Sequence, residues 1–147
     1  MATCILPTRV SLNHHLFAGG APDSLRHLIL DISRGCKYVH NAIRTTDLGL
    51  AGSSNTFGEE QLKLDVLSNN IIKGELCESR LVHSIASEEE AMIQELNDDG
   101  KFLVVFDPLD GSSLVDCNLA IGSIFGIYEK GDIMGKTPRD QVAALYV

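Results

Sequence analysis

Apolar positions recur at helical spacing in two stretches of the first half of the chain. Residues 25–43 carry an apolar side chain every three or four positions, at Leu25, Leu28, Ile29, Ile32, Cys36, Val39 and Ile43. This spacing predicts one face of an amphipathic helix that begins at Pro22-Asp23-Ser24 and ends near Arg44. A second helix is predicted over residues 61–72, with an apolar face made of Leu62, Val66, Leu67 and Ile71.

Shorter apolar runs, rich in β-branched and aromatic residues, predict strands in the second half. The expected strands are residues 81–86, 101–106 and 120–128. After the first of them, Ser87 is followed three residues later by Glu90, which fits a capping box and predicts a helix over residues 88–96. Thr137-Pro138 fits a further helix start ahead of an apolar run.

This order of elements predicts an α/β fold, a layered sandwich of long helices on a mixed sheet. With 147 residues, the chain is long enough to bury a core of its own. Residues 1–20 show little periodicity, so we expect a mobile N-terminal arm followed by one domain over residues 21–147. Because the chain stops within an apolar run and without a cap, we expect it to be truncated at 147. Residues 45–57, rich in Gly, Ser and Thr, predict a loop.

Charge and cysteine content narrow the class of protein. The formal net charge of −8 argues against nucleic acid or an anionic membrane surface as a partner. The N-terminus lacks the pattern of a signal peptide, and no apolar run approaches the ~18 residues of a membrane span. The four cysteines are widely spaced, which favours reduced thiols over a zinc site or a disulfide framework. We therefore expect a cytoplasmic protein.

A seven-residue segment directly after the strand at 101–106 carries most of the candidate chemistry. In Asp107-Pro108-Leu109-Asp110-Gly111-Ser112-Ser113, two carboxylates follow the strand and a proline stands between them. Mg²⁺ prefers carboxylate oxygens together with the phosphate oxygens of a substrate. Gly111 permits a close backbone approach, and two serines can begin a helix whose N–H groups face a phosphate. The segment predicts a metal and phosphate site; the structural alternative is an ordinary turn or helix cap.

Other acidic residues have both a structural and a functional interpretation. Glu88 and Glu89 are residues typical of the first turn of a helix. They also stand where a second strand end could meet residues 107–113, the signature segment. Asp65 is surrounded by apolar residues, which is costly unless the carboxylate is paired or binds a metal. Its alternative is a place on the solvated face of the helix. The residues alone leave both interpretations open.

Three blocks of sequence together resemble a known family. They are GEEQLKLDVLSN (residues 58–69), ASEEE (residues 86–90) and FDPLDGSSLVDCNLAIGSIFGIY (residues 106–128). In this order they resemble the class I fructose-1,6-bisphosphatases, of the inositol monophosphatase-like sugar phosphatases, over roughly residues 25–147. The resemblance implies the N-terminal domain of the sugar phosphatase fold. Members of that family are considerably longer than this chain, so we expect an N-terminal half.

The resemblance implies Mg²⁺-dependent hydrolysis of the 1-phosphate of fructose 1,6-bisphosphate to fructose 6-phosphate, in gluconeogenesis or in pentose phosphate or Calvin-type sugar metabolism. It implies two or three Mg²⁺ ions, with Mn²⁺ as a possible substitute, as in multi-metal phosphatase sites. The partner would be a sugar bisphosphate, and the assembly a homo-oligomer, tetrameric in relatives. Two alternatives stay open: a sedoheptulose-1,7-bisphosphatase, or a catalytically incomplete metal-binding or dimerising fragment.

The resemblance also assigns roles to particular residues. The metal ligands would be Glu88, Asp107, Asp110 and the backbone carbonyl of Leu109. The catalytic carboxylates beside the attacking water would be Asp65 and Glu89. The phosphate would be bound by Asp110, Gly111, Ser112 and Ser113. The sequence departs from the family at Asn70 and Leu114, where an acid and an asparagine are usual. Because an amide takes up no proton at neutral pH, either activation of water depends on Asp65 and Glu89 or turnover by this chain is slow.

Overall fold

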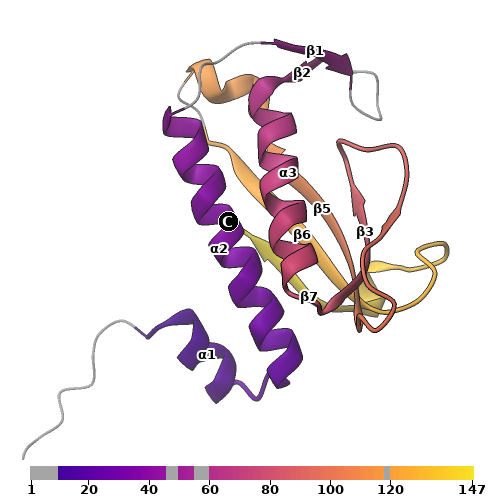
Figure 1. Cartoon of the computed structure of the whole chain (residues 1–147). Helices are drawn as coiled ribbons and strands as arrows, with labels where there is room; N and C mark the ends of the chain where they lie inside the picture. Colours follow the sequence, from indigo (N-terminus) through magenta and orange to yellow (C-terminus); the bar gives the residue numbers. More distant parts are fainter. Residues whose placement is uncertain (1–9, 46–49, 55–59, 118–119) are drawn as a thin grey trace, which may run out of the picture.

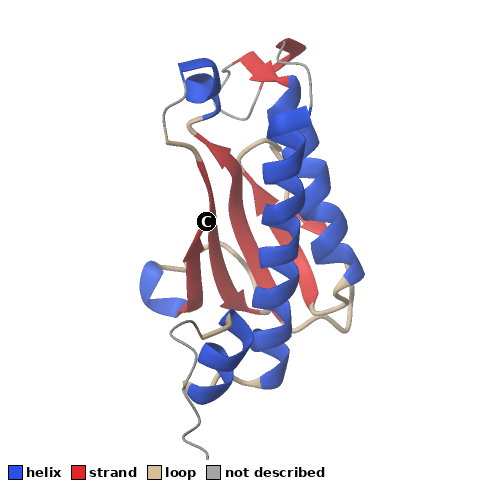
Figure 2. Ribbon diagram, turned by 90° about the vertical axis from the view of Figure 1, so that its left-hand side faces the viewer, coloured by secondary structure: helices blue, strands red, loops and turns tan. Residues whose placement is uncertain are grey.

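The fold is a layer of two long helices on a mixed five-stranded sheet. The computed structural model describes residues 10–45, 50–54, 60–117 and 120–147. The helices α2 (Asp23–Thr45) and α3 (Lys63–Glu78) lie side by side over one face of the sheet (Figure 1 and Figure 2). This arrangement confirms the predicted α/β sandwich.

The sheet has the strand order β4-β3-β5-β6-β7. Its strands are β3 (Val82–Ser87), β4 (Gln94–Glu95), β5 (Phe102–Asp110), β6 (Gly122–Glu129) and β7 (Gln141–Tyr146). β3 and β5 run parallel, whereas the other neighbouring pairs run antiparallel. The three strands expected from the sequence are therefore all present, and β5 extends four residues beyond its predicted end, from 106 to 110.

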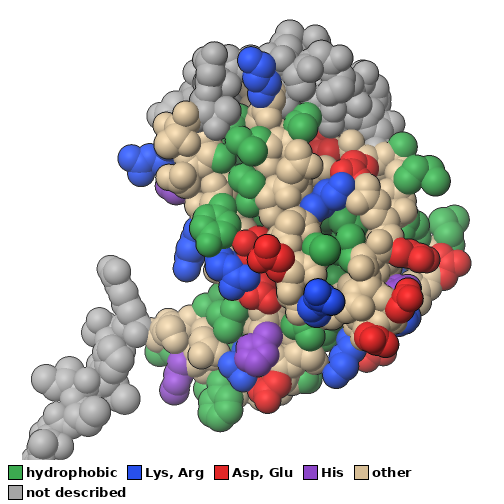
Figure 3. All heavy atoms as spheres, in the orientation of Figure 1, with side chains coloured by type: hydrophobic (Ala, Val, Ile, Leu, Met, Phe, Trp, Pro, Cys, Tyr) green, Lys and Arg blue, Asp and Glu red, His purple; other side chains and the backbone are tan. Residues whose placement is uncertain are grey.

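The core lies between the helices and the sheet. The stripe predicted on α2 is buried there, with Leu28, Ile29, Ile32, Cys36 and Val39 each at most 6% exposed. It packs with residues of α3 and of the sheet: Leu64, Ile72, Leu76, Val104, Phe106, Phe125 and Ile127. On the outer side of the helices, acidic and basic side chains are interspersed (Figure 3). The opposite face of the sheet is more open, since Ile124 is 41% exposed and Tyr146 64%.

The second long helix differs from its prediction in bounds and in orientation. α3 begins at Lys63 and continues to Glu78, six residues past the expected end at residue 72. Its buried face carries Leu64, Asp65, Ser68, Asn69, Ile72, Glu75 and Leu76. The predicted apolar face was wrong, because Val66, Leu67 and Ile71 are only partly buried. Apolar periodicity failed here because polar residues occupy much of the buried stripe.

The helix predicted over residues 88–96 is also wrong. Residues 88–89 form a turn, and Gln94–Glu95 form the short strand β4 beside β3. Near the C-terminal end, the predicted helix start at Thr137-Pro138 is confirmed. The helix itself is a single 3₁₀ turn, η2 (Pro138–Asp140), capped by Thr137. The apolar run that follows is strand β7, in which partly buried and exposed residues alternate.

Two earlier segments contain more structure than expected. Within the predicted arm, residues Leu12–Ala18 form the helix α1, capped by the side chain of Ser11; residues 1–9 lie outside the described part. Within the predicted loop, β1 (Leu50–Ser54) pairs with β2 (Glu60–Leu62), while residues 46–49 and 55–57 lie outside the described part. Among all described segments, no helix is long and apolar enough to span a membrane.

Candidate functional site

The ends of the parallel strands β3 and β5 bring two predicted site residues together. Ser87 at the end of β3 is paired with Phe106 on β5, and the backbone N–H of Glu88 donates to the carbonyl of Phe106 at 3.0 Å. Glu88 therefore leaves the sheet next to Asp107. Both residues line one cavity of about 810 Å³, which Ile124 and Tyr146 also line. Two acids predicted from separate motifs thus share one cavity on the open face of the sheet.

A shift in strand register places the second aspartate on the same face. Asp107 is opposite Ile124 and Asp110 is opposite Gly122, so three steps along β5 match two steps along β6. One extra residue on β5 is the geometry of a β-bulge, which offsets the strict alternation of side chains. A Cβ added at Gly122 would lie 2.6 Å from the ring of Tyr146, which lines the cavity. Asp107 and Asp110 therefore occupy positions on the cavity side of the sheet.

Hydrogen bonds hold the backbone of the signature segment. The Oδ1 atom of Asp107 accepts from the N–H of Leu109 at 2.9 Å, closing a turn of the type common for aspartate. The Oγ of buried Ser123 donates to the carbonyl of Pro108 at 2.8 Å. Leu109 itself is only 4% exposed, so its side chain anchors the turn in the core. The acids are thereby presented on a fixed backbone.

The phosphate-binding residues predicted after the strand begin a short helix. Gly111 has a φ of +81°, a left-handed conformation that glycine adopts without strain. The six-residue 3₁₀ helix η1 (Ser112–Cys117) starts directly after it, so the prediction of a helix start at the serines is confirmed. Asp110 and Ser113 are exposed, while Gly111 and Ser112 are partly buried.

Asp65 lies in the first turn of α3 and is 4% exposed. The interpretation that placed it on the solvated face of its helix is therefore wrong. A carboxylate in the first turn is favoured by the helix dipole, which lowers the cost of its burial. Ser68 and Asn69 continue the same buried face and are 0% and 5% exposed. The two residues whose types depart from the family pattern are both exposed: Asn70 on α3, and Leu114, which is 38% exposed.

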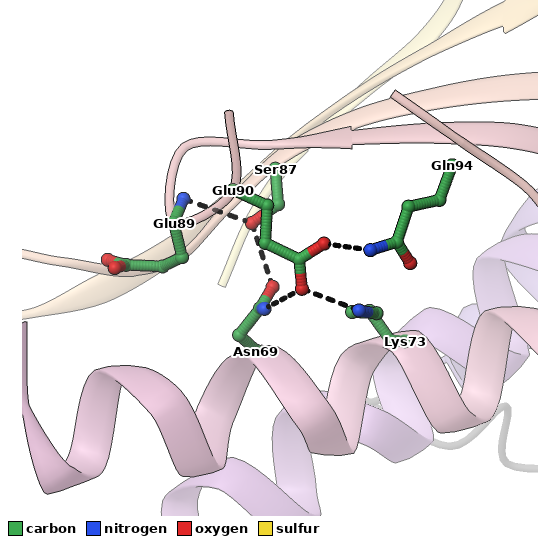
Figure 4. A network of polar contacts seen from close by, with 6 residues as sticks. All are labelled: Asn69, Lys73, Ser87, Glu89, Glu90 and Gln94. Atoms are coloured by element: carbon green, nitrogen blue, oxygen red, sulfur yellow. Dashed lines mark hydrogen bonds and ion pairs between the residues drawn. The ribbon is translucent and has the colours of Figure 1, made fainter. Parts of the chain in front are cut away.

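A polar network joins α3 to the turn that carries Glu88 and Glu89 (Figure 4). Its centre is the carboxylate of Glu90, which accepts from Asn69, Lys73 and Gln94. The capping box predicted between Ser87 and Glu90 is wrong: the Oγ of Ser87 accepts from the N–H of Glu89, and the Glu90 side chain bonds to α3. Neither Asn69 nor Lys73 was predicted to take part in a site, and Lys73 lies beyond the helix end predicted at residue 72.

The donor set has the chemistry of a hard-cation site. Carboxylate and carbonyl oxygens are the ligands that Mg²⁺ and similar cations take in proteins. Within residues 10–45, 50–54, 60–117 and 120–147, no three His, Cys, Asp or Glu side chains are close enough to hold a metal ion as they stand. Two carboxylates on one cavity, with a third on the same face, nevertheless fit a divalent cation in kind, and the cation would draw in further oxygen ligands.

A family match and two curated relatives all point to the fructose-1,6-bisphosphatases. Residues 6–147 match the family described as "Fructose-1-6-bisphosphatase, N-terminal domain". The chain is 54% identical over 141 residues to the class 1 fructose-1,6-bisphosphatase of Geobacter metallireducens, covering 95% of this chain and 45% of that protein. It is 38% identical to the corresponding protein of Neisseria meningitidis serogroup B, covering 92% of this chain and 45% of that one.

Two solved structures share the fold. A putative sedoheptulose-1,7 bisphosphatase from Toxoplasma gondii superposes with a TM-score of 0.84 at 38% identity, covering 96% of this chain and 46% of that one. Fructose-1,6-bisphosphatase of Leishmania major in its holo form gives a TM-score of 0.83 at 30% identity, covering 95% and 49%. The chain thus spans about half the length of the relatives that it matches. By the match over residues 6–147, this chain belongs to the fructose-1,6-bisphosphatase family, whose N-terminal domain it contains.

Proposed function

We propose that this chain supplies the N-terminal half of a Mg²⁺-dependent fructose-1,6-bisphosphatase, which hydrolyses the 1-phosphate of fructose 1,6-bisphosphate to fructose 6-phosphate and phosphate. The observation that carries the proposal is the shared cavity of Glu88 and Asp107, with Asp110 on the same face, in a member of this family. Carboxylates alone would repel a bisphosphate, so the substrate requires a cation that inverts the local charge.

The protein groups would divide the work as follows. Glu88, Asp107, Asp110 and the backbone carbonyl of Leu109 would hold two or three Mg²⁺ ions, or Mn²⁺ in their place. A bound cation of this kind lowers the pKa of a water molecule and polarises the phosphoryl group. Asp65 and Glu89 orient the attacking water and accept its proton. Backbone N–H groups of Gly111, Ser112 and Ser113 neutralise charge on the phosphoryl oxygens.

A second substrate has support of its own. The match to a putative sedoheptulose-1,7 bisphosphatase reaches a TM-score of 0.84, slightly above that of the Leishmania fructose-1,6-bisphosphatase at 0.83. Sedoheptulose 1,7-bisphosphate presents the same phosphate ester on a longer sugar, so the same cavity would serve it. The residues that contact the sugar would decide between the two substrates, and the comparison of phosphate release from each substrate measures that choice.

The test is phosphate release from both sugar bisphosphates with Mg²⁺, with Mn²⁺ and with EDTA. We would assay the 147-residue chain, and a chimera that joins it to the remaining half of the Geobacter metallireducens relative. In the chimera we expect metal-dependent release from fructose 1,6-bisphosphate, lowered about 100-fold or more by Asp110→Asn, because a metal carboxylate contributes several kcal/mol. Asp99→Asn, at an exposed position before β5, is the matched control.

The outcomes separate the alternatives. Release that is independent of metal, or equal in the Asp110→Asn and parent chimeras, would contradict the proposed function. Metal binding by the 147-residue chain without release would identify it as a catalytically incomplete fragment of the same enzyme. We also propose that the complete protein is a cytoplasmic homo-oligomer. Sedimentation of the chimera as a monomer at micromolar concentration would contradict the oligomer.

A further inference from the structure

The turn formed by Glu88, Glu89 and Glu90 is not stabilised by a helix of its own. The backbone bonds of the turn include one from Glu88 to the carbonyl of Phe106 at 3.0 Å and one from Glu90 to the carbonyl of Ser87 at 3.3 Å. Glu88 lines the cavity on the open face of the sheet. The same short turn must therefore present one acid to the cavity while its other end faces α3.

Side chains of α3 support the turn through Glu90. The Oε1 atom of Glu90 accepts from Asn69 Nδ2 at 2.8 Å and from Lys73 Nζ at 2.5 Å, and its Oε2 atom accepts from Gln94. Figure 4 shows the Glu90 carboxylate between these three donors, while the Glu89 side chain points away from them. Glu90 is thus committed to α3, which separates its role from that of its two acidic neighbours.

Asn69 connects this anchor to the backbone of the candidate ligands. Its Oδ1 atom accepts from Ser87 Oγ at 2.8 Å, and Ser87 Oγ in turn accepts from the backbone N–H of Glu89 at 3.2 Å. Asn69 is 5% exposed and Ser87 9%. Hydrogen bonds in such a sheltered place are stronger than in water, and breaking one leaves a polar group without a partner. A continuous path therefore runs from α3 through one amide to the turn.

We propose that Asn69, with Lys73 and Glu90, is a positioning residue for the metal site, because it fixes the turn that carries Glu88 and Glu89. The inference rests on the proposed function, in which Glu88 binds the cation and Glu89 orients the water. Partners behind metal ligands commonly affect metal affinity by about 10- to 100-fold. Loss of the Asn69 amide should have an effect of that size, although Asn69 itself contacts neither metal nor substrate.

The experiment uses paired variants of the chain and two readouts. Asn69→Ala removes both hydrogen bonds, and Asn69→Asp places a second carboxylate against Glu90. The double variant Asn69→Asp with Glu90→Gln restores one amide and one carboxylate in reversed order. Asn41→Ala, at an exposed position on α2, is the control. The readouts are hydrogen exchange of the Glu89 and Glu90 amides without metal, and the Kd for Mn²⁺ by electron paramagnetic resonance.

We expect both single variants to exchange faster at these amides and to bind Mn²⁺ about 10- to 100-fold more weakly. The double variant should recover to within a few-fold of the parent, and Asn41→Ala should match the parent. Should Asn69→Ala fail to fold, the comparison of Asn69→Asp with the double variant still tests the positioning role. Unchanged exchange and an Mn²⁺ Kd within twofold of the parent in Asn69→Asp would overturn the positioning role. Absence of Mn²⁺ binding by both the parent chain and the chimera would overturn the proposed function instead, whatever the exchange rates show.

Discussion

The two long helices bury very different faces against the same sheet. α2 buries Leu28, Ile29, Ile32, Cys36 and Val39, a stripe without a charged residue. α3 buries Leu64, Ile72 and Leu76 on a face shared with four polar side chains: Asp65, Ser68, Asn69 and Glu75. An apolar stripe is sufficient to attach a helix to a sheet, and the buried face of α2 is of that kind. The polar stripe of α3 needs another explanation.

Buried polar groups reduce stability unless each has a partner, so their presence on α3 indicates a function other than packing. Their positions along the helix differ. Asp65 lies in the first turn, Asn69 supports the turn of the candidate metal ligands, and Glu75 pairs with Arg34 of α2. Ser68 is 0% exposed, and among the described residues its Oγ has no hydrogen-bond partner. We infer that α3 gives up stability to hold polar groups behind the site.

The largest expected contrast is between an apolar truncation on α2 and a polar truncation on α3. Ile32→Ala should lower the free energy of unfolding by about 2–5 kcal/mol, because it leaves a cavity in the core. Ser68→Ala should raise it by about 1 kcal/mol, because it removes a buried hydroxyl that has no partner in the described part of the chain, and introduces a better helix former. Urea denaturation of the chain measures both. A loss of more than 1 kcal/mol in Ser68→Ala would contradict this view of α3.

The same contrast explains what the sequence could predict. The bounds and face of α2 and the strands β3, β5 and β6 were predicted well, because their apolar residues follow the period of the element. The face of α3 was predicted wrongly, because polar side chains stand at its core positions. The helix expected over residues 88–96 failed for a related reason: Glu90 has the sequence position of a capping residue but bonds to Lys73 and Asn69 of α3.

The candidate site was predictable in its residues and not in its geometry. Glu88 follows the end of β3, and Asp107 and Asp110 belong to the last part of β5; local sequence can indicate such positions. Their common face depends on the extra residue in β5 and on the parallel pairing of β3 with β5. The extra residue and the parallel pairing cannot be recognised in the local sequence, because both depend on which strands become neighbours in the sheet. The role of Asn69 depends in addition on a contact with a segment 21 residues away.

The ion pair between the helices should show the next largest effect. Arg34 donates to Glu75 Oε2 through Nε and Nη2, each at 2.7 Å, and the Glu75 side chain is only 11% exposed. Arg34→Ala should destabilise the chain by about 1–2 kcal/mol, because it leaves a nearly buried carboxylate; the 46% exposure of Arg34 limits the loss. Adding Glu75→Met should recover most of it, and Arg44→Ala, at the exposed end of α2, serves as the control. A double variant less stable than Arg34→Ala would show that Glu75 is needed for more than this pair.

Two glycines test how closely the helices approach each other. A Cβ at Gly35 of α2 would lie 3.0 Å from Ile72 Cδ1 and 3.2 Å from Glu75 Cγ, whereas one at Gly74 of α3 would meet nothing within 4 Å. Gly74→Ala should therefore stabilise the chain by about 0.5–1 kcal/mol, the usual gain inside a helix. Gly35→Ala should lose that gain to crowding. Equal increases in thermal denaturation temperature for the two variants would mean that the helices can separate freely at Gly35.

The smallest effect concerns one cysteine on each helix. Cys36 of α2 is buried and Cys77 of α3 is exposed. Burial raises the pKa of the Cys36 thiol above its ordinary value of 9.0, although a hydrogen bond with Ser123 opposes the shift. In a variant in which Cys4 and Cys117 are serine, a thiol reagent at pH 8 should modify Cys77 quickly and Cys36 only as the chain unfolds.

The sign of the pH dependence follows from the same shift. The folded chain holds the proton of the Cys36 thiol more tightly than the unfolded chain does. The protonated Cys36 thiol therefore contributes its full stabilisation of the folded chain below the ordinary thiol pKa. This stabilisation is lost as the pH rises through the raised value in the folded chain. The free energy of unfolding should therefore fall more steeply above pH 9 in the parent than in Cys36→Ala, while Cys77→Ala should follow the parent. Parallel curves for all three would show that water reaches the thiol, and that the core beneath α2 is less dry than its apolar stripe indicates.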